Sequence, residues 1–287
     1  MEKNISIIGG DLRMVKLAIF LSENNKIKTY GLEDSDEIQR NERIQKCDSI
    51  EQALREVDFV IGPIPFSSNM KTINAPFFNK DITINELIQN FNSKIFIAGN
   101  ISKDILEIME GKNIKVIDIM KQEEMVILNT IATAEGTIEV AMKNTEKIIH
   151  GSNVLVLGFG RVGKIVAEKF ANLLSNVTCA VRKNIDKAWI EAYGYQSMDI
   201  NNLCNLENFD IIINTVPYCI IQENELKQMR KDVLLIDLAS TPGGIDREAV
   251  KKQNKKFVWA LSLPGKVAPV TTAKYIKDTI YNILENS

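Results

Sequence analysis

The sequence is short of the side chains on which many active sites depend. Its 287 residues include one histidine, two tryptophans and four cysteines. The cysteines, Cys47, Cys179, Cys204 and Cys219, are far apart and show neither C-x-x-C nor Cys/His spacing. No metal site is therefore indicated, and free buried thiols are expected.

Long apolar runs and blocks of like charge are also missing. No run approaches the roughly 20 residues of a membrane span, and the apolar run near the N-terminus is too short for a signal peptide. The formal net charge of −2, without a basic block, gives no electrostatic footprint for nucleic acid. These absences predict a cytoplasmic protein without a membrane or nucleic-acid partner.

The residues that are present repeat one pattern twice. Short β-branched runs alternate with helix-like stretches, which indicates βαβ units and parallel sheets. The runs lie at 5–10, 26–31, 58–65, 94–99 and 114–119, and again at 153–160, 176–182, 209–217, 232–240 and 257–265. The fold class expected is α/β, with two doubly wound Rossmann-like parallel-sheet domains and an interdomain cleft.

The chain length also favours two domains. We expect a substrate domain at 1–122, an interdomain helical segment at 123–149, and a nucleotide-binding domain at 150–271. The segment should form one interrupted helix, because Ile138, Ala141, Met142 and Thr145 recur at helical spacing. The tail at 272–287 should form a helix that completes the first domain, with an apolar stripe of Tyr275, Ile276, Ile280, Ile283 and Leu284.

The second copy of this pattern begins with a glycine fingerprint, in VLVLGFGRVG (154–163). Its glycines end an expected strand and begin an expected helix, the context in which G-x-G-x-x-G binds a dinucleotide. The pyrophosphate then lies on free N–H groups at the helix N-terminus. A glycine turn without a ligand is the alternative. The expected coenzyme contacts are Gly158, Phe159, Gly160, Arg161, Val162 and Gly163.

The end of the following strand indicates which coenzyme is used. An NAD-binding domain places a carboxylate about twenty residues beyond the glycines, to hold the ribose 2′-hydroxyl. This chain has Arg182 and Lys183 there. Because cations complement a 2′-phosphate, NADP is predicted, unless the pair is only a solvated strand end.

Several other loops should lie at the carboxyl ends of strands, where open α/β sheets bind ligands. The loops at 62–68, 214–219, 239–244 and 263–269 are rich in Gly, Pro, Ser and Thr, although turn chemistry explains each one singly. Within them, Thr215, Val216 and Pro217 are added to the coenzyme contacts. In the first copy of the pattern, the corresponding turn IIGGDLR lacks the third glycine. Asp11 should cap the helix that follows. Arg13 should form either a surface ion pair or a contact to an anion.

The single histidine is poorly placed for catalysis. His150 immediately precedes the strand that carries the glycines. It should therefore lie a strand length, roughly 15–20 Å, from the nicotinamide end of the site. A histidine that accepts the proton as hydride leaves is not expected here.

These motifs together resemble the A subunits of dipicolinate synthase, a bacterial sporulation oxidoreductase. The resemblance runs through IIGGDLR, ATAEGTIEVAM, IHGSNVLVLGFGRVG, INTVP, DLASTPGGID and LPGKVAP in this order. In outline the chain also resembles the two-domain D-2-hydroxyacid dehydrogenases. It departs from the family where Lys183 follows Arg182 and where Val270, rather than a lysine, follows Pro269.

The resemblance implies a reaction, a partner and a setting. The reaction is the NADP-dependent oxidation of the cyclic product of dihydrodipicolinate synthase to pyridine-2,6-dicarboxylate. The partner is the flavoprotein-like B subunit of dipicolinate synthase, and the setting is the cytoplasm of the mother cell in a sporulating bacterium. A homo-oligomer is also possible. A D-2-hydroxyacid dehydrogenase and a nucleotide-binding protein without catalytic activity are the alternatives.

A ring with two carboxylates needs cationic or N–H donors. The expected substrate contacts are Arg13, Thr133, Ser240, Thr241, Gly243 and Gly244. Glu135 is the expected proton acceptor, or else a carboxylate at a helix N-terminus, and Lys266 completes the expected catalytic pair. Aromatisation lowers the barrier to proton loss, so positioning against the nicotinamide is expected to supply most of the catalysis.

Overall fold

The computed structural model describes residues 2–92 and 95–285 and forms two compact units. The first domain comprises Met1–Asn129 and Ala268–Ser287, and the second comprises Thr130–Val267. Met1, Ser93, Lys94, Asn286 and Ser287, which belong to segments expected above, lie outside the described residues.

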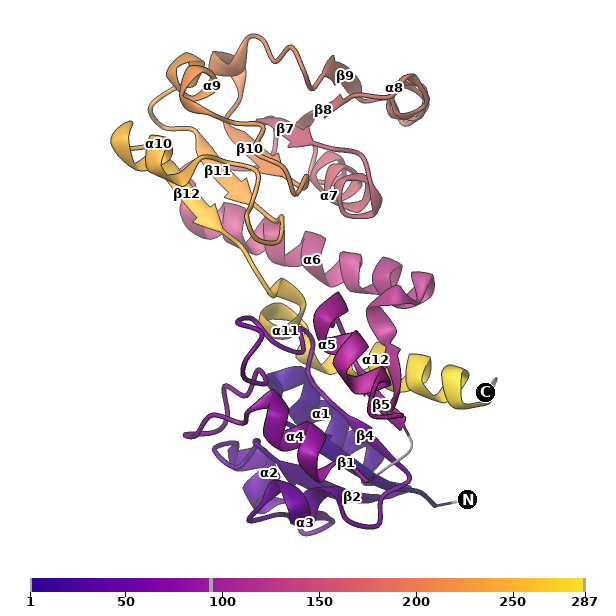
Figure 1. Cartoon of the computed structure of the whole chain (residues 1–287). Coiled ribbons are helices and arrows are strands. Elements are labelled where there is room, and N and C mark those ends of the chain that lie inside the picture. Colours follow the sequence, from indigo (N-terminus) through magenta and orange to yellow (C-terminus); the bar gives the residue numbers. More distant parts are fainter. Residues whose placement is uncertain (1, 93–94, 286–287) are drawn as a thin grey trace. The chain divides into compact units, whose positions relative to one another are not determined.

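The first domain is a parallel sheet of six described strands in the order β3-β2-β1-β4-β5-β6 (Figure 1). Its elements are β1 (Asn4–Ile8), α1 (Leu12–Leu21), β2 (Lys26–Tyr30), α2 (Asp36–Arg40), β3 (Ile44–Lys46), α3 (Ile50–Leu54), β4 (Phe59–Ile61), α4 (Ile84–Asn90), β5 (Ile95–Ala98), α5 (Lys103–Glu110), β6 (Lys115–Asp118) and the short 3₁₀ helix η1 (Ile119–Lys121). The C-terminal helix α12 (Pro269–Glu285) also belongs to this domain.

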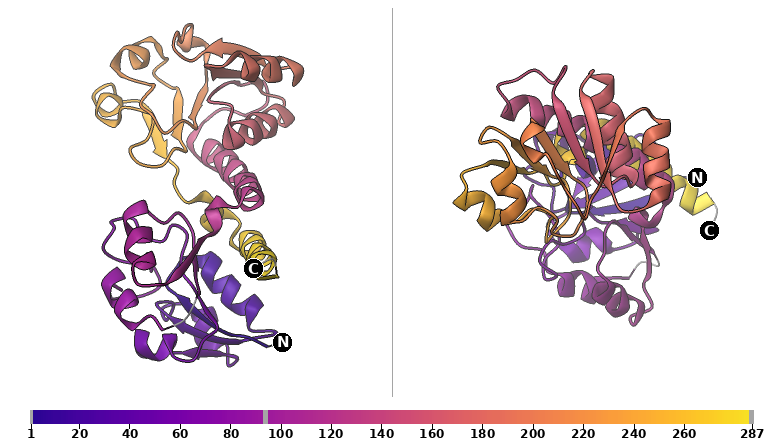
Figure 2. Two further views of the ribbon diagram at one scale, coloured as in Figure 1. Left: turned by 45° about the vertical axis from the view of Figure 1, so that its right-hand side comes forward. Right: turned by 90° about the horizontal axis from the view of Figure 1, so that it is seen from above.

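Alternating side chains of the first sheet fill a core on each face. Ile5 and Ile7 pack with Leu17 of α1 and Ile276 of α12. On the other face, Val60 and Phe96 pack with α3, α4 and α5. Figure 2 shows the yellow α12 beside the indigo α1, the two helices that cover one face.

The second domain has the same topology, with the described strand order β12-β11-β10-β7-β8-β9. Its elements are α6 (Glu123–Asn144, which begins in the first domain), β7 (Asn153–Leu157), α7 (Arg161–Asn172), β8 (Asn176–Val181), α8 (Asn184–Ala192), β9 (Gln196–Asp199), the 3₁₀ helix η2 (Leu206–Asn208), β10 (Ile211–Asn214), α9 (Glu223–Gln228), β11 (Leu234–Asp237), α10 (Arg247–Lys252), β12 (Lys256–Trp259) and α11 (Leu263–Val267). Helices α6, α7 and α8 cover one face, and α9 and α10 cover the other. The two Rossmann-like sheets expected from the sequence are thus confirmed.

The two domains also share a detail at the amino edge of their sheets. In the first, the Asp58 carboxylate accepts the N–H of Asn4 at 2.8 Å. In the second, Asp210 accepts the N–H of Asn153 at 3.0 Å. Each aspartate immediately precedes the strand that pairs with the strand it caps, so the same contact closes both sheets.

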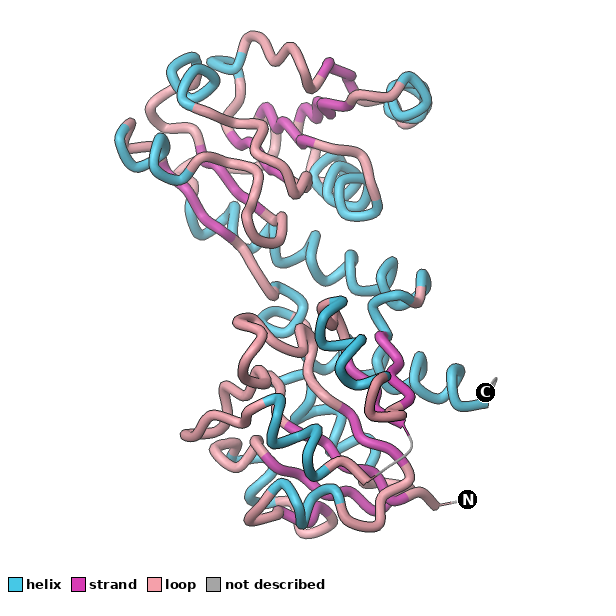
Figure 3. Tube along the Cα trace, in the orientation of Figure 1, coloured by secondary structure: helices cyan, strands magenta, loops and turns pink. Residues whose placement is uncertain are grey.

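Several local expectations were wrong. Helix α6 is uninterrupted over 22 residues, as Figure 3 shows, and Met142 on it is exposed. The short edge strands β3 and β9 were missed. The thiols are free, but only Cys47 and Cys179 are buried.

Helix α6 is the one helix of the described chain that is long and apolar enough, by length and composition alone, to cross a membrane. Its Ala134, Thr137 and Ala141 are buried, and both alanines contribute to the core of the second domain. This is the pattern of a core helix rather than of a lipid-facing one.

Candidate active site

The glycine turn of the second domain connects β7 to α7. Gly158 has a φ of +94°, and a Cβ there would lie 2.7 Å from the Thr215 Oγ1 atom. A Cβ on Gly163 would lie 2.3 Å from the Gly158 carbonyl oxygen. Both positions therefore require glycine for the fold itself, one for the backbone conformation and the other for the close packing of helix on turn.

Gly160 differs from its two neighbours in the fingerprint. Its φ is −74°, and a Cβ there would meet no atom within 4 Å. The protein's own packing thus gives no reason for a glycine at this position. Open space at the start of the 12-residue helix α7, whose first N–H groups lack intrahelical partners, fits the close approach of a pyrophosphate.

The remaining residues of the fingerprint are Phe159, Arg161 and Val162. Phe159 is buried, with the Lys164 ammonium 5.7 Å from its ring centroid and Tyr193 at 6.1 Å between centroids. Arg161 and Val162 form the first turn of α7. The structure therefore brings all six fingerprint residues to one turn.

Arg182 and Lys183 directly follow β8, the strand next to β7. Both side chains are exposed, and Lys183 is the N-cap residue of α8. The two cations thus lie at the same carboxyl edge of the sheet as the glycine turn, as the sequence predicted.

Thr215, Val216 and Pro217 follow β10, the other neighbour of β7. The Thr215 hydroxyl donates to the Leu157 carbonyl at 2.8 Å, and its backbone N–H donates to the same carbonyl at 3.0 Å. The expected coenzyme loop is therefore bonded directly to the strand that carries the glycines.

Two buried polar residues at this edge were not predicted from the sequence. Asn214 and Asp237 are the last residues of β10 and β11 and face each other in register. The Asn214 Nδ2 atom donates to the Asp237 Oδ1 atom at 2.7 Å. The signal was present, since each polar residue ends a continuous apolar run, but the pairing depends on strand order.

The backbone N–H groups of the loop after β11 form hydrogen bonds within the second domain. The Gly243 N–H donates to the Ser240 carbonyl at 2.8 Å, and the Gly244 N–H donates to the Asp237 Oδ2 atom at 2.7 Å. Both N–H groups, which were expected to receive a substrate carboxylate, are thus hydrogen-bonded within the protein. Ser240 and Thr241 of the same loop are exposed.

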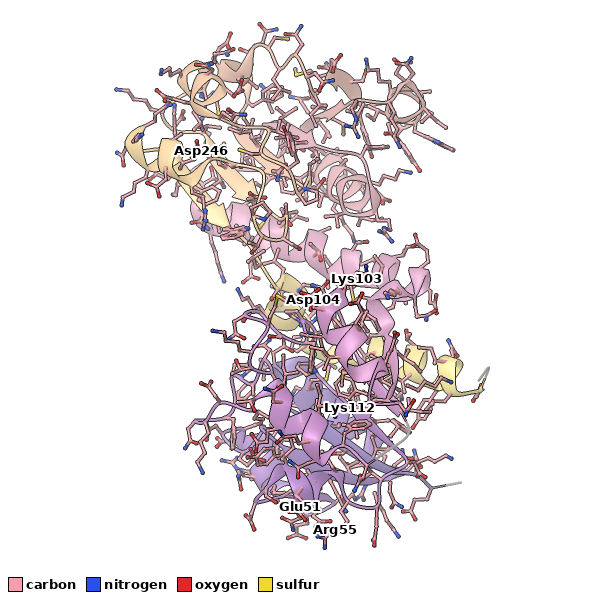
Figure 4. The ribbon with its side chains drawn as sticks, in the orientation of Figure 1. Glu51, Arg55, Lys103, Asp104, Lys112 and Asp246 are labelled. Carbon is pink, nitrogen blue, oxygen red and sulfur yellow. The ribbon has the colours of Figure 1, made fainter. Side chains whose placement is uncertain are left out.

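The same loop ends in a helix cap. Asp246, labelled in Figure 4, accepts the N–H groups of Glu248 and Ala249 at 3.0 Å each and starts α10. The side chain of Arg247 then stacks on Trp259, with 4.4 Å from its Cζ atom to the ring centroid. The loop from Ser240 to Asp246 is thus fixed at both of its ends.

Glu135 and Thr133 lie within α6, and Lys266 lies on α11. Glu135 is half exposed and pairs with Lys169 of α7 at 3.3 Å. It lies in the middle of α6, so its alternative role as a helix N-terminal carboxylate was wrong. Helices α6 and α11 meet where a Cβ on Gly136 would lie 3.0 Å from the Leu263 Cβ atom; the Lys266 side chain is exposed.

The glycine turn of the first domain is covered by its own chain. The Gly10 N–H donates to the Asn74 carbonyl at 2.8 Å, and a Cβ on Gly9 would lie 3.0 Å from the same oxygen. A ligand cannot approach this turn as it can at Gly160. The missing third glycine of IIGGDLR agrees with this difference.

Arg13 is buried, with 3% of its side chain exposed. Its Nη2 atom lies 2.7 Å from the Asp11 carboxylate and also donates to the Ile64 carbonyl. Asp11 caps α1 as expected, accepting the Arg13 N–H at 3.0 Å. The Arg13 guanidinium is therefore buried and bonded to the loop at Ile64, whereas 21% of the Asp11 side chain is exposed.

His150 is exposed at the amino end of β7, away from the glycine turn. A hollow of about 390 Å³ at the same amino edge is lined by amides, including Asn153, Asn176 and Gln196, and contains none of the predicted site residues. Among the described residues, no three His, Cys, Asp or Glu side chains gather as a metal site.

Two known families match different parts of the chain. Residues 4–120 match the family described as the N-terminal domain of the dipicolinate synthase A subunit. Residues 128–256 match the family described as D-isomer specific 2-hydroxyacid dehydrogenase, NAD binding domain. The open glycine turn thus lies in the part that matches a nucleotide-binding family.

Individual relatives extend the match along the chain. The dipicolinate synthase A subunit of Bacillus subtilis is 31% identical over 284 residues, which cover 98% of this chain and 95% of that protein. The crystal structure of the dipicolinate synthase A subunit from Bacillus halodurans is 32% identical, with a TM-score of 0.88 over 98% of this chain and 97% of that one. Shikimate dehydrogenase (NADP(+)) of Methanococcus maripaludis is 26% identical over 218 residues, 65% of this chain and 76% of that protein. The chain belongs to the family of dipicolinate synthase A subunits and carries a dehydrogenase-type nucleotide-binding domain.

Proposed function

We propose that this chain is an NADP-dependent oxidoreductase that converts the cyclic dihydrodipicolinate-type precursor to dipicolinate. The observation that carries the proposal is the open space at Gly160, at the N-terminus of α7, in a family named for dipicolinate synthase. The nicotinamide coenzyme would accept a hydride from the ring.

The preference for NADP is supported by charge at the end of β8. A carboxylate there would hold the ribose 2′-hydroxyl of NAD, whereas Arg182 and Lys183 are complementary to a 2′-phosphate. The shikimate dehydrogenase relative, whose name specifies NADP, agrees with this preference.

Proton removal is assigned to Glu135. When hydride leaves one ring carbon, a proton must leave a neighbouring carbon for the pyridine to form, and a carboxylate can accept it. Because the product is aromatic, a moderately basic group suffices. Holding the ring in a reactive geometry can itself supply about 7–11 kcal/mol of the barrier reduction.

The ring carboxylates are assigned to one cation and three hydroxyl groups of the second domain. Lys266 is an exposed cation, and the exposed Ser240 and Thr241 can donate hydroxyl hydrogens. Thr133 of α6 is kept as the third hydroxyl candidate. Arg13 and the N–H groups of Gly243 and Gly244 are not retained, since each is bonded within its own domain.

The name of the relatives also bears on the setting. A protein named as an A subunit has at least one companion. We propose that the partner of this chain is the flavoprotein-like B subunit of dipicolinate synthase. The proposed location is the mother-cell cytoplasm of a sporulating bacterium.

The experiment follows absorbance at 340 nm. Purified chain, alone and with the B subunit, is incubated with the product of dihydrodipicolinate synthase and either NADP or NAD. Formation of NADPH together with dipicolinate, faster with NADP than with NAD, is expected. Oxidation of D-2-hydroxyacids instead would identify the chain as a D-2-hydroxyacid dehydrogenase, and coenzyme binding without turnover in either mixture would identify it as a binding protein without catalytic activity.

A further inference from the structure

The pair of Asn214 and Asp237 is enclosed in the sheet edge, with 0% and 1% of each residue exposed. The Asp237 carboxylate accepts three N–H groups, from Asn214 Nδ2 at 2.7 Å, from Ala239 at 3.0 Å and from Gly244 at 2.7 Å. Backbone and amide donors thus satisfy this buried carboxylate. A carboxylate in such a place is stable only while those donors stay in position.

Asn214 extends the pair to the next loop. Its Nδ2 atom donates to the Val216 carbonyl at 2.9 Å, and its Oδ1 atom accepts the Val216 N–H at 3.2 Å. Both hydrogens and the oxygen of the amide are therefore used. The residue fixes the loop that contains Thr215, Val216 and Pro217.

Gly244, in the loop after β11, packs against the Asn214 side chain. A Cβ there would lie 2.2 Å from the Asn214 Nδ2 atom, so the loop after β11 can lie on the amide only because the residue is glycine. Its carbonyl accepts the N–H groups of Ile220 and Ile221 at 2.9 and 3.2 Å. The loops after β10 and β11 are in this way bonded to each other through one buried pair.

We propose that Asp237 is a positioning residue for coenzyme binding, acting through Asn214 and Gly244 on the loops at 215–217 and 240–244. This inference rests on the proposed function, because it takes the loop at 215–217 to contact NADP. Asp237 itself touches neither substrate nor coenzyme. Removing its charge should let the two loops separate and should weaken coenzyme binding more than it weakens the fold.

The first domain supplies a matched control. Asp118 ends β6, is buried, and accepts two N–H groups on Oδ1, from Asn100 and Met120, and one on Oδ2, from Ile101. Asp237 likewise accepts two on Oδ1 and one on Oδ2. In both cases an Asp→Asn substitution places an NH₂ group against an N–H donor, so the two variants should lose similar stability.

The test measures the NADP dissociation constant by calorimetry and the melting temperature of the full-length chain and its variants. Asp237→Asn should weaken NADP binding at least about 10-fold, while Asp118→Asn, with a comparable drop in melting temperature, should stay within about 2-fold of the unmodified chain. Equal NADP affinity in a folded Asp237→Asn variant would overturn the inference. Failure of the unmodified chain to bind NADP would overturn the proposed function as well.

A second variant keeps the inference testable if Asp237→Asn does not fold. Asn214→Asp places two carboxylates in contact, and such a pair holds together only while it shares a proton. NADP affinity of this variant should fall at least about 10-fold between pH 6 and pH 9, relative to the unmodified chain. Cys219, Glu225 and Asp246 are the other ionisable groups near this edge, and the profile of the unmodified chain is subtracted to remove their effect. A pH profile parallel to that of the unmodified chain would contradict the positioning role.

Discussion

At the residue scale, the cation at Arg182 should set coenzyme preference. Arg182→Asp should reduce the preference for NADP over NAD about 10- to 150-fold, because it removes a charge-assisted contact worth roughly 1.5–3 kcal/mol. Dissociation constants for both coenzymes provide the measurement. Lys251→Asp, an exposed charge reversal on α10, is the control. A variant at position 182 that still prefers NADP as strongly as before would remove the cofactor assignment.

Glu135 offers a second test at the same scale. Glu135→Gln should lower turnover at least about 100-fold, the usual contribution of a general base, with little effect on stability because its pair with Lys169 is exposed. Glu139→Gln is the matched control: it lies one turn along α6 and pairs with Lys143 in the same exposed manner. If both variants turn over at the original rate, Glu135 is not the proton acceptor.

Individual residues were predictable from sequence where one local pattern fixes them. The spacing of Gly158, Gly160 and Gly163 implies its own geometry, and Arg182 follows at a set distance. Asn214 and Asp237 were not predictable, because they are 23 residues apart and meet only through strand order. The burial of Arg13 was also hidden, since its second partner, Ile64, lies 51 residues away.

At the element scale, the junction of β7 and α7 allows binding to be separated from folding. Gly160→Ala should leave the melting temperature nearly unchanged, because a Cβ there meets nothing, yet it should weaken NADP binding at least about 10-fold by filling the space for the pyrophosphate. Gly163→Ala should lower the melting temperature as well, since its Cβ would collide with the Gly158 carbonyl. Unchanged NADP affinity in Gly160→Ala would show that the open space has another purpose.

The opposite, amino edge of the second sheet carries an ionic cluster. Asp210 pairs with Lys147 and Arg230, each at 2.9 Å, and 14% of its side chain is exposed. Burial alone would raise the pKa of Asp210, but the Asn153 N–H and the two cations outweigh it and lower the pKa below its ordinary value of 3.8. The pKa of Asp232 in the same cluster is also lowered, mainly by its hydrogen bond from Arg230 and to a smaller extent by that from Lys147.

This cluster predicts how stability depends on pH. Because the folded pKa of Asp210 is below the unfolded value, its stabilising effect is present above about pH 4 and is lost as the pH falls further. Asp210→Asn should lower the free energy of unfolding by about 1–3 kcal/mol at pH 7 and by much less near pH 3. Urea unfolding at both pH values measures this. A difference that grows as the pH falls would contradict the assignment.

Whole elements were predictable where the pattern is long. The central strands and the helices at 161–172 and 269–285 follow from apolar periodicity. The edge strands β3 and β9 were missed because they have three and four residues and few apolar side chains. Helix α6 continues through Gly136 because Leu263 packs against that glycine, a tertiary contact that offsets its low helix propensity.

At the scale of the whole molecule, one topology occurs twice with different outcomes. In the first domain the glycine turn is bonded to Asn74, whereas in the second the turn is open at Gly160. The repeat was visible in the sequence, but the cover over the first turn was not, because its contacts come from a loop more than sixty residues away. Only the second domain should therefore bind a dinucleotide.

A crystal structure of the chain with NADP is the most direct test of the coenzyme site. The expected result has the pyrophosphate at the N-terminus of α7 beside Gly160, and the 2′-phosphate within hydrogen-bonding distance of the Arg182 guanidinium. An adenosine bound elsewhere, for example at the Gly9 turn, or an open Gly160 turn at saturating NADP, would contradict it.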